Sequence, residues 1–395
     1  LVSKKIAQAL AGSSVIRAMF NEGKEMAARY GAENVYDFSL GNPATPAPES
    51  VNRSIKEIVD EMDPLELHGY MSNSGYEDVR RTMAENLNRR FQTSFDAHNI
   101  IMTVGAAGGL NIIFKTLLDP EDEVIVFAPY FGEYKSYAAN FDAKIVEVEP
   151  DFASFQPDLE KFTRKITAKT KIVLVNTPNN PTGVVYTEET LQEMAEILRK
   201  KEQEFKTDIY FVSDEPYREL VYDDVKEIFL TKYYHNTIVG YSFSKSLSLP
   251  GERIGYVIVP DEVTESKTVY AAIAGAGRAL GYVCAPSMFQ KVITACVGNT
   301  GDIELYKKNR DLLYDGLTKI GYECFKPQGA FYMFVKALEP DADAFCERAK
   351  EQDLLIVSAT GFGCPGYARV SYCVDYDMIE RSFTAFEKLY KSYQG

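Results

Sequence analysis

Five short apolar runs alternate along this chain with polar segments of helical period. The runs are rich in Val and Ile and occupy residues 124–128, 172–175, 209–212, 238–241 and 254–259. They are too short for buried helices, so they predict strands that are covered on both faces. Helical patterns such as 188–204 follow several of them. The alternation predicts an α/β fold with a mostly parallel sheet sandwiched by helices.

The rest of the chain predicts a second, smaller unit. At 395 residues the chain exceeds the size at which one hydrophobic core usually stops growing. An amphipathic helix from about Asp302 is followed by strand-like segments at 331–335 and 368–374. We expect a large ligand-binding domain over 48–300 and a discontinuous α+β domain built from 1–47 and 301–395.

Charge and cysteine usage limit the partners and the location. Lys and Arg number 43 and Asp and Glu 57, and the resulting net charge of −14 repels nucleic acid and anionic membranes. Arg278 interrupts the longest apolar stretch, and no secretory leader is evident. The six cysteines form no C-x-x-C pair suited to zinc or redox exchange. We therefore expect reduced thiols, no metal site, no membrane partner and a cytoplasmic location.

Chemically useful side chains follow four of the predicted strands. Open α/β sheets bind ligands at the carboxyl ends of their strands, so these side chains should meet at one edge. They comprise an aromatic ring, an amide, a carboxylate and an amine, namely Phe131, Asn180, Asp214 and Lys245.

Residues 242–255 read Ser-Phe-Ser-Lys-Ser-Leu-Ser-Leu-Pro-Gly-Glu-Arg-Ile-Gly. This segment resembles the lysine signature of class I aminotransferases at each defining position. The resemblance, to the aspartate aminotransferase type (fold type I) of pyridoxal 5'-phosphate enzymes, extends from Gly41 to Arg369. It implies that Lys245 holds the cofactor as a Schiff base. It also implies that the substrates are an L-amino acid and a 2-oxo acid in a ping-pong reaction, with glutamate and 2-oxoglutarate as one pair.

The catalytic roles have physical requirements of their own. A lysine amine attacks an aldehyde only when burial or a nearby cation keeps part of it neutral, and Lys245 can then move the α-proton. A carboxylate beside the pyridine nitrogen favours the protonated ring that acts as an electron sink, and Asp214 suits this role. An Asp-Glu pair after a strand can instead hold a metal in nucleotide hydrolases, but the chain has no Walker A sequence. By resemblance, Tyr217 and Asn180 contact the cofactor's phenolic oxygen.

A phosphate needs backbone donors at a helix amino terminus and a cation. The glycine-rich turn at 105–109 can supply the donors through Gly105, Ala106 and Ala107, although close helix packing favours the same composition. The resemblance adds a cation, two hydroxyl groups and a tyrosine that reaches across a homodimer, namely Arg253, Ser242, Ser244 and Tyr70.

The ring of the cofactor needs an aromatic neighbour, and the chain contains no Trp. The resemblance gives this place to Phe131. Tyr130 is its nearest competitor, and either residue could instead be an ordinary core aromatic.

Substrate recognition centres on arginine, because a guanidinium binds a carboxylate through two parallel hydrogen bonds. By resemblance, Arg369 binds the α-carboxylate and the backbone of Gly41 contributes a second contact. A lysine that meets the distal carboxylate in one bacterial subgroup is replaced here by Ala107. We predict that Arg278 takes over that role across the dimer interface, the alternative being a structural arginine at the interface.

Three functions are compatible with these residues: a transaminase, a carbon–sulfur β-lyase and a non-catalytic cofactor sensor. The sensor is disfavoured because the catalytic lysine, aspartate and arginine are all present. The lyase shares the first steps with the transaminase and differs only in the fate of the carbanion. The Gly-Ala-Phe-Tyr segment at 329–332 resembles that of amino acid transaminases and favours the transaminase.

Overall fold

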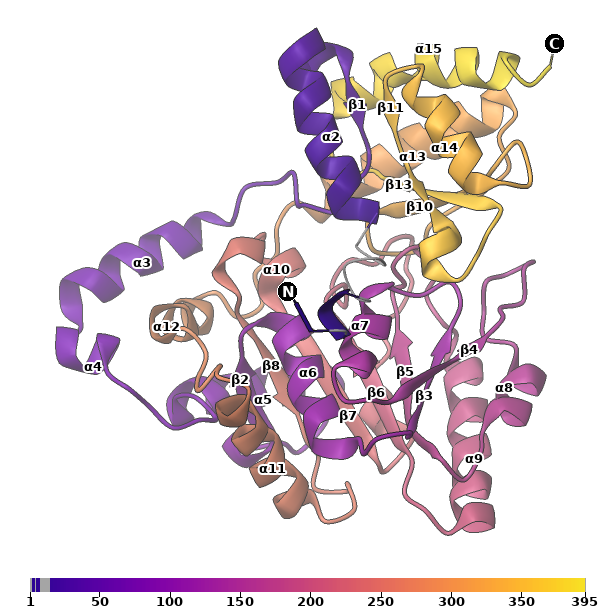
Figure 1. The fold of residues 1–395 in the computed structure, drawn as a ribbon. Helices are drawn as coiled ribbons and strands as arrows, with labels where there is room; N and C mark the ends of the chain where they lie inside the picture. The colour runs from indigo at the N-terminus through magenta and orange to yellow at the C-terminus, as the bar shows by residue number, and fades with distance from the viewer. Residues whose placement is uncertain (1, 4, 8–14, 395) are drawn as a thin grey trace.

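The structure is a computed structural model that describes residues 2, 3, 5–7 and 15–394. Figure 1 shows a large sheet covered by helices in the lower part of the molecule and a smaller α+β part above it. The large sheet contains β2 (Ile100–Thr103), β3 (Glu123–Phe127), β4 (Lys144–Val148), β5 (Thr170–Asn176), β6 (Tyr210–Asp214), β7 (Thr237–Ser242) and β8 (Gly255–Ile258).

The helices around this sheet are α5 (Glu77–Phe91), α6 (Gly105–Leu117), α7 (Glu133–Ala139), α8 (Leu159–Lys165), α9 (Glu188–Phe205), α10 (Phe243–Ser246) and α11 (Ser266–Ala279). Beside them lie α3 (Glu49–Glu61), α4 (Pro64–His68) and α12 (Ser287–Ala295). Short 3-10 turns occur at Ala97–Asn99 (η2), Leu230–Lys232 (η3) and Pro250–Glu252 (η4).

The smaller part contains α2 (Val15–Tyr30), α13 (Ile303–Ile320), α14 (Ala342–Lys350) and α15 (Tyr376–Lys391). Its strands are β1 (Tyr36–Asp37), β9 (Cys324–Phe325), β10 (Tyr332–Lys336), β11 (Leu354–Leu355), β12 (Val357–Ser358) and β13 (Tyr367–Ser371). The 3-10 turns η1 (Ala32–Asn34) and η5 (Ala359–Phe362) complete it.

The large sheet has the strand order β2-β8-β7-β6-β5-β3-β4. All neighbouring strands are parallel except β8, which runs antiparallel to β7 and β2. The predicted α/β class with a mostly parallel sheet is therefore confirmed. The apolar run at 254–259 differs from the other predicted strands, because β8 follows β7 after only α10 and η4 and runs back antiparallel beside it. A parallel neighbour would need a longer crossover connection. The edge strand β4 was not predicted, since Lys144 and Glu147 interrupt the apolar pattern of its sequence Lys-Ile-Val-Glu-Val.

Both faces of the sheet are buried, as the unbroken apolar runs predict. On β3, Val124 and Val126 pack into the cluster that includes Ile112 and Ile273 of the helices α6 and α11. The alternate residues Ile125 and Phe127 pack into the cluster on the other face, which includes Leu191 and Met194 of α9. The sheet is therefore rigidly held between two helical layers.

In the smaller part, the antiparallel sheet β12-β13-β10-β9 packs against helices from the end of the chain. The strand β1 pairs with β11 in parallel, and Phe38 lies next to Phe386 of α15 with 5.8 Å between ring centroids. The segment around β1 therefore lies beside the end of the chain. The domain boundaries at 47/48 and 300/301 remain predictions. Among the described residues, no helix is both long and apolar enough to cross a membrane.

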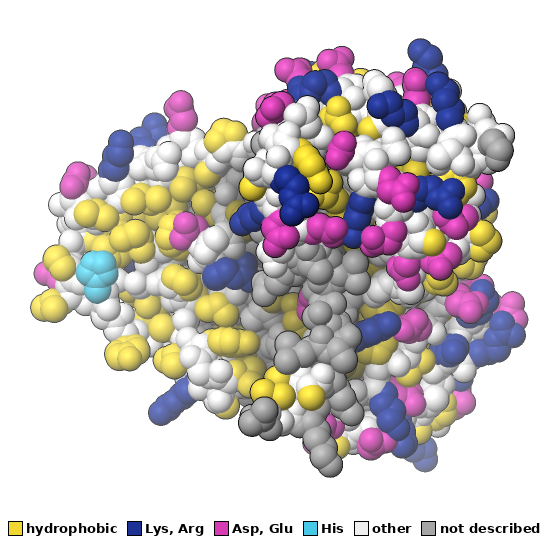
Figure 2. All heavy atoms as spheres, turned by 45° about the horizontal axis from the view of Figure 1, so that its top comes forward, with side chains coloured by type: hydrophobic (Ala, Val, Ile, Leu, Met, Phe, Trp, Pro, Cys, Tyr) yellow, Lys and Arg dark blue, Asp and Glu magenta, His cyan; other side chains and the backbone are white. Residues whose placement is uncertain are grey.

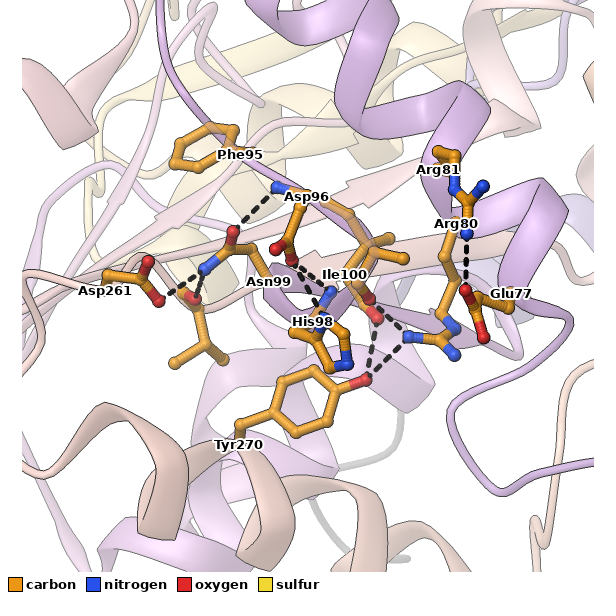
Figure 3. Close-up of polar contacts among 12 residues, drawn as sticks. Glu77, Arg80, Arg81, Phe95, Asp96, His98, Asn99, Ile100, Asp261 and Tyr270 are labelled. Atoms are coloured by element: carbon orange, nitrogen blue, oxygen red, sulfur yellow. Dashed lines mark hydrogen bonds and ion pairs between the residues drawn. The ribbon is translucent and has the colours of Figure 1, made fainter.

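A polar cluster holds the start of β2, at the sheet edge opposite the carboxyl ends of the parallel strands (Figure 3). Asn99 accepts a hydrogen bond from the amide of Asp96 at 2.9 Å and donates to Asp261 at 3.0 Å. The hydroxyl of Tyr270 from α11 donates to the carbonyl of Ile100 at 3.1 Å and lies 3.1 Å from Nη1 of Arg80. These bonds join α5, η2 and α11 to the central sheet.

Candidate active site

The carboxyl ends of β5, β6 and β7 place an amide, a carboxylate and an amine at one edge of the large sheet. The register pairs Asn176 with Asp214, and Asp214 with Gly240. The side chain of Asn176 donates to the carbonyl of Asp214 at 2.8 Å and accepts from the amide of Asn180 at 2.7 Å. Adjacent parallel strands thus bring the predicted residues together at the expected edge.

Asp214 is the last residue of β6 and is buried. The hydroxyl of Tyr134 donates to its Oδ2 at 2.6 Å, whereas the buried Oδ1 has no hydrogen-bond partner among the described residues. Burial raises the pKa of Asp214 to about 7; the bond from Tyr134 opposes this rise and the nearby Glu215 adds to it. Because an unsatisfied buried acceptor is unfavourable, Oδ1 fits a ligand that presents an N–H group.

Lys245 lies on α10, directly after β7, and is half-buried. Its Nζ donates to the carbonyl of Gly41 at 2.6 Å. Burial lowers the pKa of Lys245 to about 8; the Cys373 thiol opposes the shift and the guanidinium groups of Arg369 and Arg253 add to it. A substantial fraction of this amine is therefore neutral near pH 8, as a nucleophile requires.

Arg369 lies on β13 of the smaller part and is 1% exposed. Its Nη1 donates to Oδ1 of Asn180 at 3.1 Å and its Nη2 donates to the carbonyl of Ser39 at 2.6 Å. Its buried Nε has no acceptor among the residues that the structure describes. The guanidinium therefore joins the two parts of the molecule and keeps donor capacity for an anion.

The glycine-rich turn is part of α6, because the helix begins at Gly105 and not after the glycines as predicted. Gly105 has a φ of 78°, and a Cβ at this position would lie 2.8 Å from Nη2 of Arg253. The first-turn amides of Ala106 and Ala107 have no partner within the helix by geometry. Only glycine therefore leaves room for the cation beside these donors, which suits a phosphate.

Two serines complete this side of the site. The hydroxyl groups of Ser242 and Ser244 lie 2.7 Å apart, and the amide of Ser244 donates to Oγ of Ser242 at 3.1 Å. Arg253 is exposed and donates to the carbonyl of Pro250 at 3.0 Å. Its unused donors remain available to a ligand anion.

Three predicted residues have weaker links to this constellation. Phe131 is half-buried and packs edge-to-face on Tyr134, with 5.6 Å between centroids. Tyr70 is 94% exposed. Arg278 is exposed in the last turn of α11, and within the described part of the chain no hydrogen bond or ion pair joins it to another predicted site residue. The single chain does not bring Tyr70 and Arg278 to the site.

Two residues of the site were not predicted, Tyr134 and Tyr332. Tyr134 donates to Asp214 and packs against the predicted Phe131, three residues earlier in the chain. The hydroxyl of Tyr332 lies 2.9 Å from that of Tyr217. Tyr332 belongs to the Gly-Ala-Phe-Tyr segment, which the sequence alone did not connect to Tyr217.

Comparisons with known proteins cover nearly the whole chain. Residues 33–386 match the family described as aminotransferase class I and II. A probable aspartate/prephenate aminotransferase of Thermus aquaticus is 32% identical over 356 residues, which cover 88% of this chain and 89% of that protein. The crystal structure of an amino transferase from Eubacterium rectale matches with a TM-score of 0.97 at 56% identity, covering 100% of both chains. The aspartate aminotransferase of Thermus thermophilus with maleate matches with a TM-score of 0.88 at 27% identity, covering 98% of this chain and 99% of that one.

Proposed function

The chain belongs to the class I and II aminotransferases and is a transaminase of this pyridoxal 5'-phosphate-dependent family, and on that premise we propose its substrates and site residues. It exchanges an amino group between an L-amino acid and a 2-oxo acid in a ping-pong reaction, with glutamate and 2-oxoglutarate as one pair. The observation that carries the assignment of the site is the partnerless, buried Oδ1 of Asp214, at the same sheet edge as the half-buried amine of Lys245.

The residues at this edge fit the cofactor. When bound, it supplies a protonated pyridine ring that withdraws electrons from the α-carbon of the substrate. Asp214 would hold the ring N–H through Oδ1, and Lys245 would bond covalently to its aldehyde carbon. The residues that would hold the phosphate, the ring face and the phenolic oxygen are Gly105, Ala106, Ala107, Ser242, Ser244, Arg253, Phe131, Asn180 and Tyr217.

The protein's own groups orient the substrate and move its proton. Arg369 would bind the α-carboxylate beside Asn180 and the Gly41 backbone, because its guanidinium is desolvated and has an unused N–H donor. The Nζ of Lys245 would accept the proton from the α-carbon of the substrate and hold it for the next transfer. Burial helps both steps, since it keeps the amine partly neutral and strengthens the carboxylate contact.

A second copy of the chain completes the proposed site. Tyr70 is 94% exposed, and Val59 and Leu65 nearby are 55% and 86% exposed. Figure 2 shows hydrophobic side chains gathered over the part of the surface formed by α3, α4 and α12. An apolar surface of this kind suits an isologous partner. We therefore propose a homodimer in which the partner subunit's Tyr70 reaches the phosphate.

A half-reaction experiment tests the proposed function. Glutamate added without an oxo acid should abolish the visible absorption of the bound cofactor and release one 2-oxoglutarate per site. The reason is that a transaminase stops after one amino-group transfer when no acceptor is present. The absorption and the released oxo acid are followed together in a stopped-flow spectrophotometer and by chromatography.

Cystathionine is the matched control substrate, because a β-lyase would release pyruvate and ammonia from it repeatedly. The chain should show no such multiple turnover. Rapid pyruvate release without loss of the visible absorption by any common amino acid would support the β-lyase alternative instead.

We propose that Arg278 binds the distal carboxylate of a dicarboxylic substrate in the active site of the partner subunit. Its exposure and the alanine at position 107 support this role. A desolvated carboxylate–guanidinium pair contributes about 2–5 kcal/mol, so Arg278→Ala should lower kcat/KM for glutamate and aspartate by tens-fold or more. Alanine as substrate should be nearly unaffected.

Equal losses for alanine and glutamate would assign Arg278 to the interface alone. Analytical ultracentrifugation of both proteins provides the control, since the variant must remain a dimer for the comparison to hold. A monomeric, fully active wild type would contradict both the dimer and the role of Arg278.

A cytoplasmic location is part of the proposal and rests on cysteine usage. All six cysteines are free in the structure. Free thiols persist in reducing compartments, which supports this location.

A further inference from the structure

Tyr332 touches three parts of the site at once. It opens β10 and is 2% exposed. Its Oη lies 2.9 Å from Oη of Tyr217, and its ring centroid lies 4.5 Å from Cζ of Arg369. A Cβ at Gly41 would lie only 1.9 Å from this Oη, so the tyrosine hydroxyl occupies the space that a side chain at position 41 would need.

We propose that Tyr332 is a positioning residue that donates its hydroxyl proton to Tyr217 and supports the face of Arg369, so that one side chain aligns the cofactor contact and the carboxylate contact. This inference rests on the proposed function and deepens it.

The direction of the hydrogen bond follows from proton counting. Each tyrosine hydroxyl has one proton to donate and can accept through its oxygen. If Tyr217 donates its proton to the phenolic oxygen of the cofactor, its own oxygen must accept from Tyr332. Donation into a hydroxyl strengthens the bond that the same hydroxyl donates onward. Tyr332 therefore reinforces the hydrogen bond from Tyr217.

The ring of Tyr332 acts on Arg369. Phe362 also faces this guanidinium, with 5.3 Å from Cζ to its ring centroid. Nη1 and Nη2 of Arg369 donate hydrogen bonds to Asn180 and to the carbonyl of Ser39. These bonds and the two aromatic rings together fix the orientation of the guanidinium. A cation held on aromatic faces in a desolvated place is oriented before the carboxylate arrives.

Gly41 links this arrangement to the catalytic amine. Its carbonyl accepts from Nζ of Lys245 at 2.6 Å while its Cα side lies against Tyr332. Any side chain at position 41 would displace the tyrosine, which gives a packing reason for the glycine. The same turn thus contacts both Lys245 and Tyr332.

Among the described residues, few titratable groups lie close enough to Tyr332 and Tyr217 to affect the pKa of their hydroxyls. Arg369 and Cys373 lie near Tyr332, and Asp214 and Arg369 lie near Tyr217. Burial raises the pKa of Tyr332 to about 12 and the pKa of Tyr217 well above its usual value. Both hydroxyls therefore stay protonated below pH 10, and a spectral titration in that range reports on the bound cofactor.

The pH titration of the visible absorption of the holoenzyme tests the hydroxyl. A hydrogen bond donated to the phenolic oxygen favours the form in which this oxygen carries the full negative charge, which is the form present at high pH. Tyr332→Phe weakens that bond and should raise the midpoint by about half a unit to one unit, the shift that corresponds to one hydrogen bond of typical net strength. Tyr217→Phe should raise it further.

Tyr322→Phe is the matched control. Tyr322 is a buried tyrosine of the same part of the molecule, and its hydroxyl donates to the carbonyl of Phe386 at 3.0 Å, away from the site. This variant should lose stability like Tyr332→Phe and keep the wild-type midpoint. Thermal unfolding of both variants separates a folding defect from the spectral effect.

The ring is tested by Tyr332→Leu, which removes the aromatic face from Arg369. The KM for glutamate and the Kd for propionate, an inert monocarboxylate probe, should rise about tenfold, whereas Tyr332→Phe should change both by less than about threefold. An equal rise in the two variants would overturn the role of the ring.

The outcomes distinguish the inference from the function on which it rests. An unchanged midpoint in Tyr217→Phe would contradict the proposed contact between Tyr217 and the cofactor. A shifted midpoint in Tyr217→Phe together with an unshifted one in Tyr332→Phe would overturn the inference alone.

Discussion

The substitution Lys245→Ala is expected to lower kcat/KM by at least about 10⁴-fold, the upper range of what one general acid–base group contributes. The loss should be this large because the same Nζ serves as the attachment point of the cofactor and as the carrier of the α-proton. The amine is suited to both roles, since burial lowers its pKa to about 8.

Borohydride reduction followed by peptide mapping checks this expectation. The wild type should yield a single modified peptide that contains Lys245, and the variant should yield none. Lys336→Ala is the control, since Lys336 lies exposed on β10 in an ion pair with Glu323. A modified peptide that contains a different lysine would refute the assignment.

The second large effect is expected for Asp214→Asn. The amide preserves the shape and can still accept from Tyr134, but it removes the negative charge that would pair with the ring N–H. Breaking a buried charge pair costs about 3–5 kcal/mol, so the rate of the glutamate half-reaction should fall about 10²- to 10⁴-fold. The affinity of the cofactor-free protein for pyridoxal 5'-phosphate should fall as well, measured by absorption titration.

The same substitution predicts a change in the pH dependence of stability of the cofactor-free protein. Asp214 has a pKa of about 7 in the folded chain against 3.8 for an ordinary aspartate. Between these values the folded state binds the extra proton, so the free energy of unfolding falls as pH rises through this window. The expected loss is on the order of 4 kcal/mol between pH 4 and pH 7, and it is absent in Asp214→Asn.

Urea unfolding of both cofactor-free proteins at pH 4 and pH 7 measures this difference. Other groups titrate equally in the two proteins, so the comparison isolates Asp214. An identical pH dependence in wild type and variant would show that Asp214 is ionised in the folded, cofactor-free chain and would contradict the desolvation argument.

The placement of the parallel strands and of the residues that follow them could be predicted from local pattern. Short Val- and Ile-rich runs are strands in such an alternation, and a side chain that follows a parallel strand must lie at its carboxyl end. Asn180, Asp214 and Lys245 were found in this way. The resemblance at residues 242–255 and along the chain supplied the family and the roles of the other site residues. The family is confirmed, and the individual roles remain predictions.

The contacts between distant segments were decided only by the tertiary structure. Tyr134 and Asp214 are 80 residues apart, Tyr217 and Tyr332 are 115 apart, and Arg369 and Ser39 are 330 apart. Local periodicity reports which face of an element is buried but not which partner covers it, because that depends on how the layers pack. The antiparallel direction of β8 and the start of α6 at Gly105 likewise depend on packing and could not be predicted from local periodicity.

The sequence by itself therefore determined the fold class and the kind of groups at the sheet edge, because both follow from short-range pattern. Packing determined the unpaired Oδ1 of Asp214, the partly neutral amine of Lys245 and the position of Tyr332 between Tyr217 and Arg369. Desolvation and hydrogen-bond geometry arise only when segments far apart in the chain enclose a group, and these two effects set the chemistry of the site.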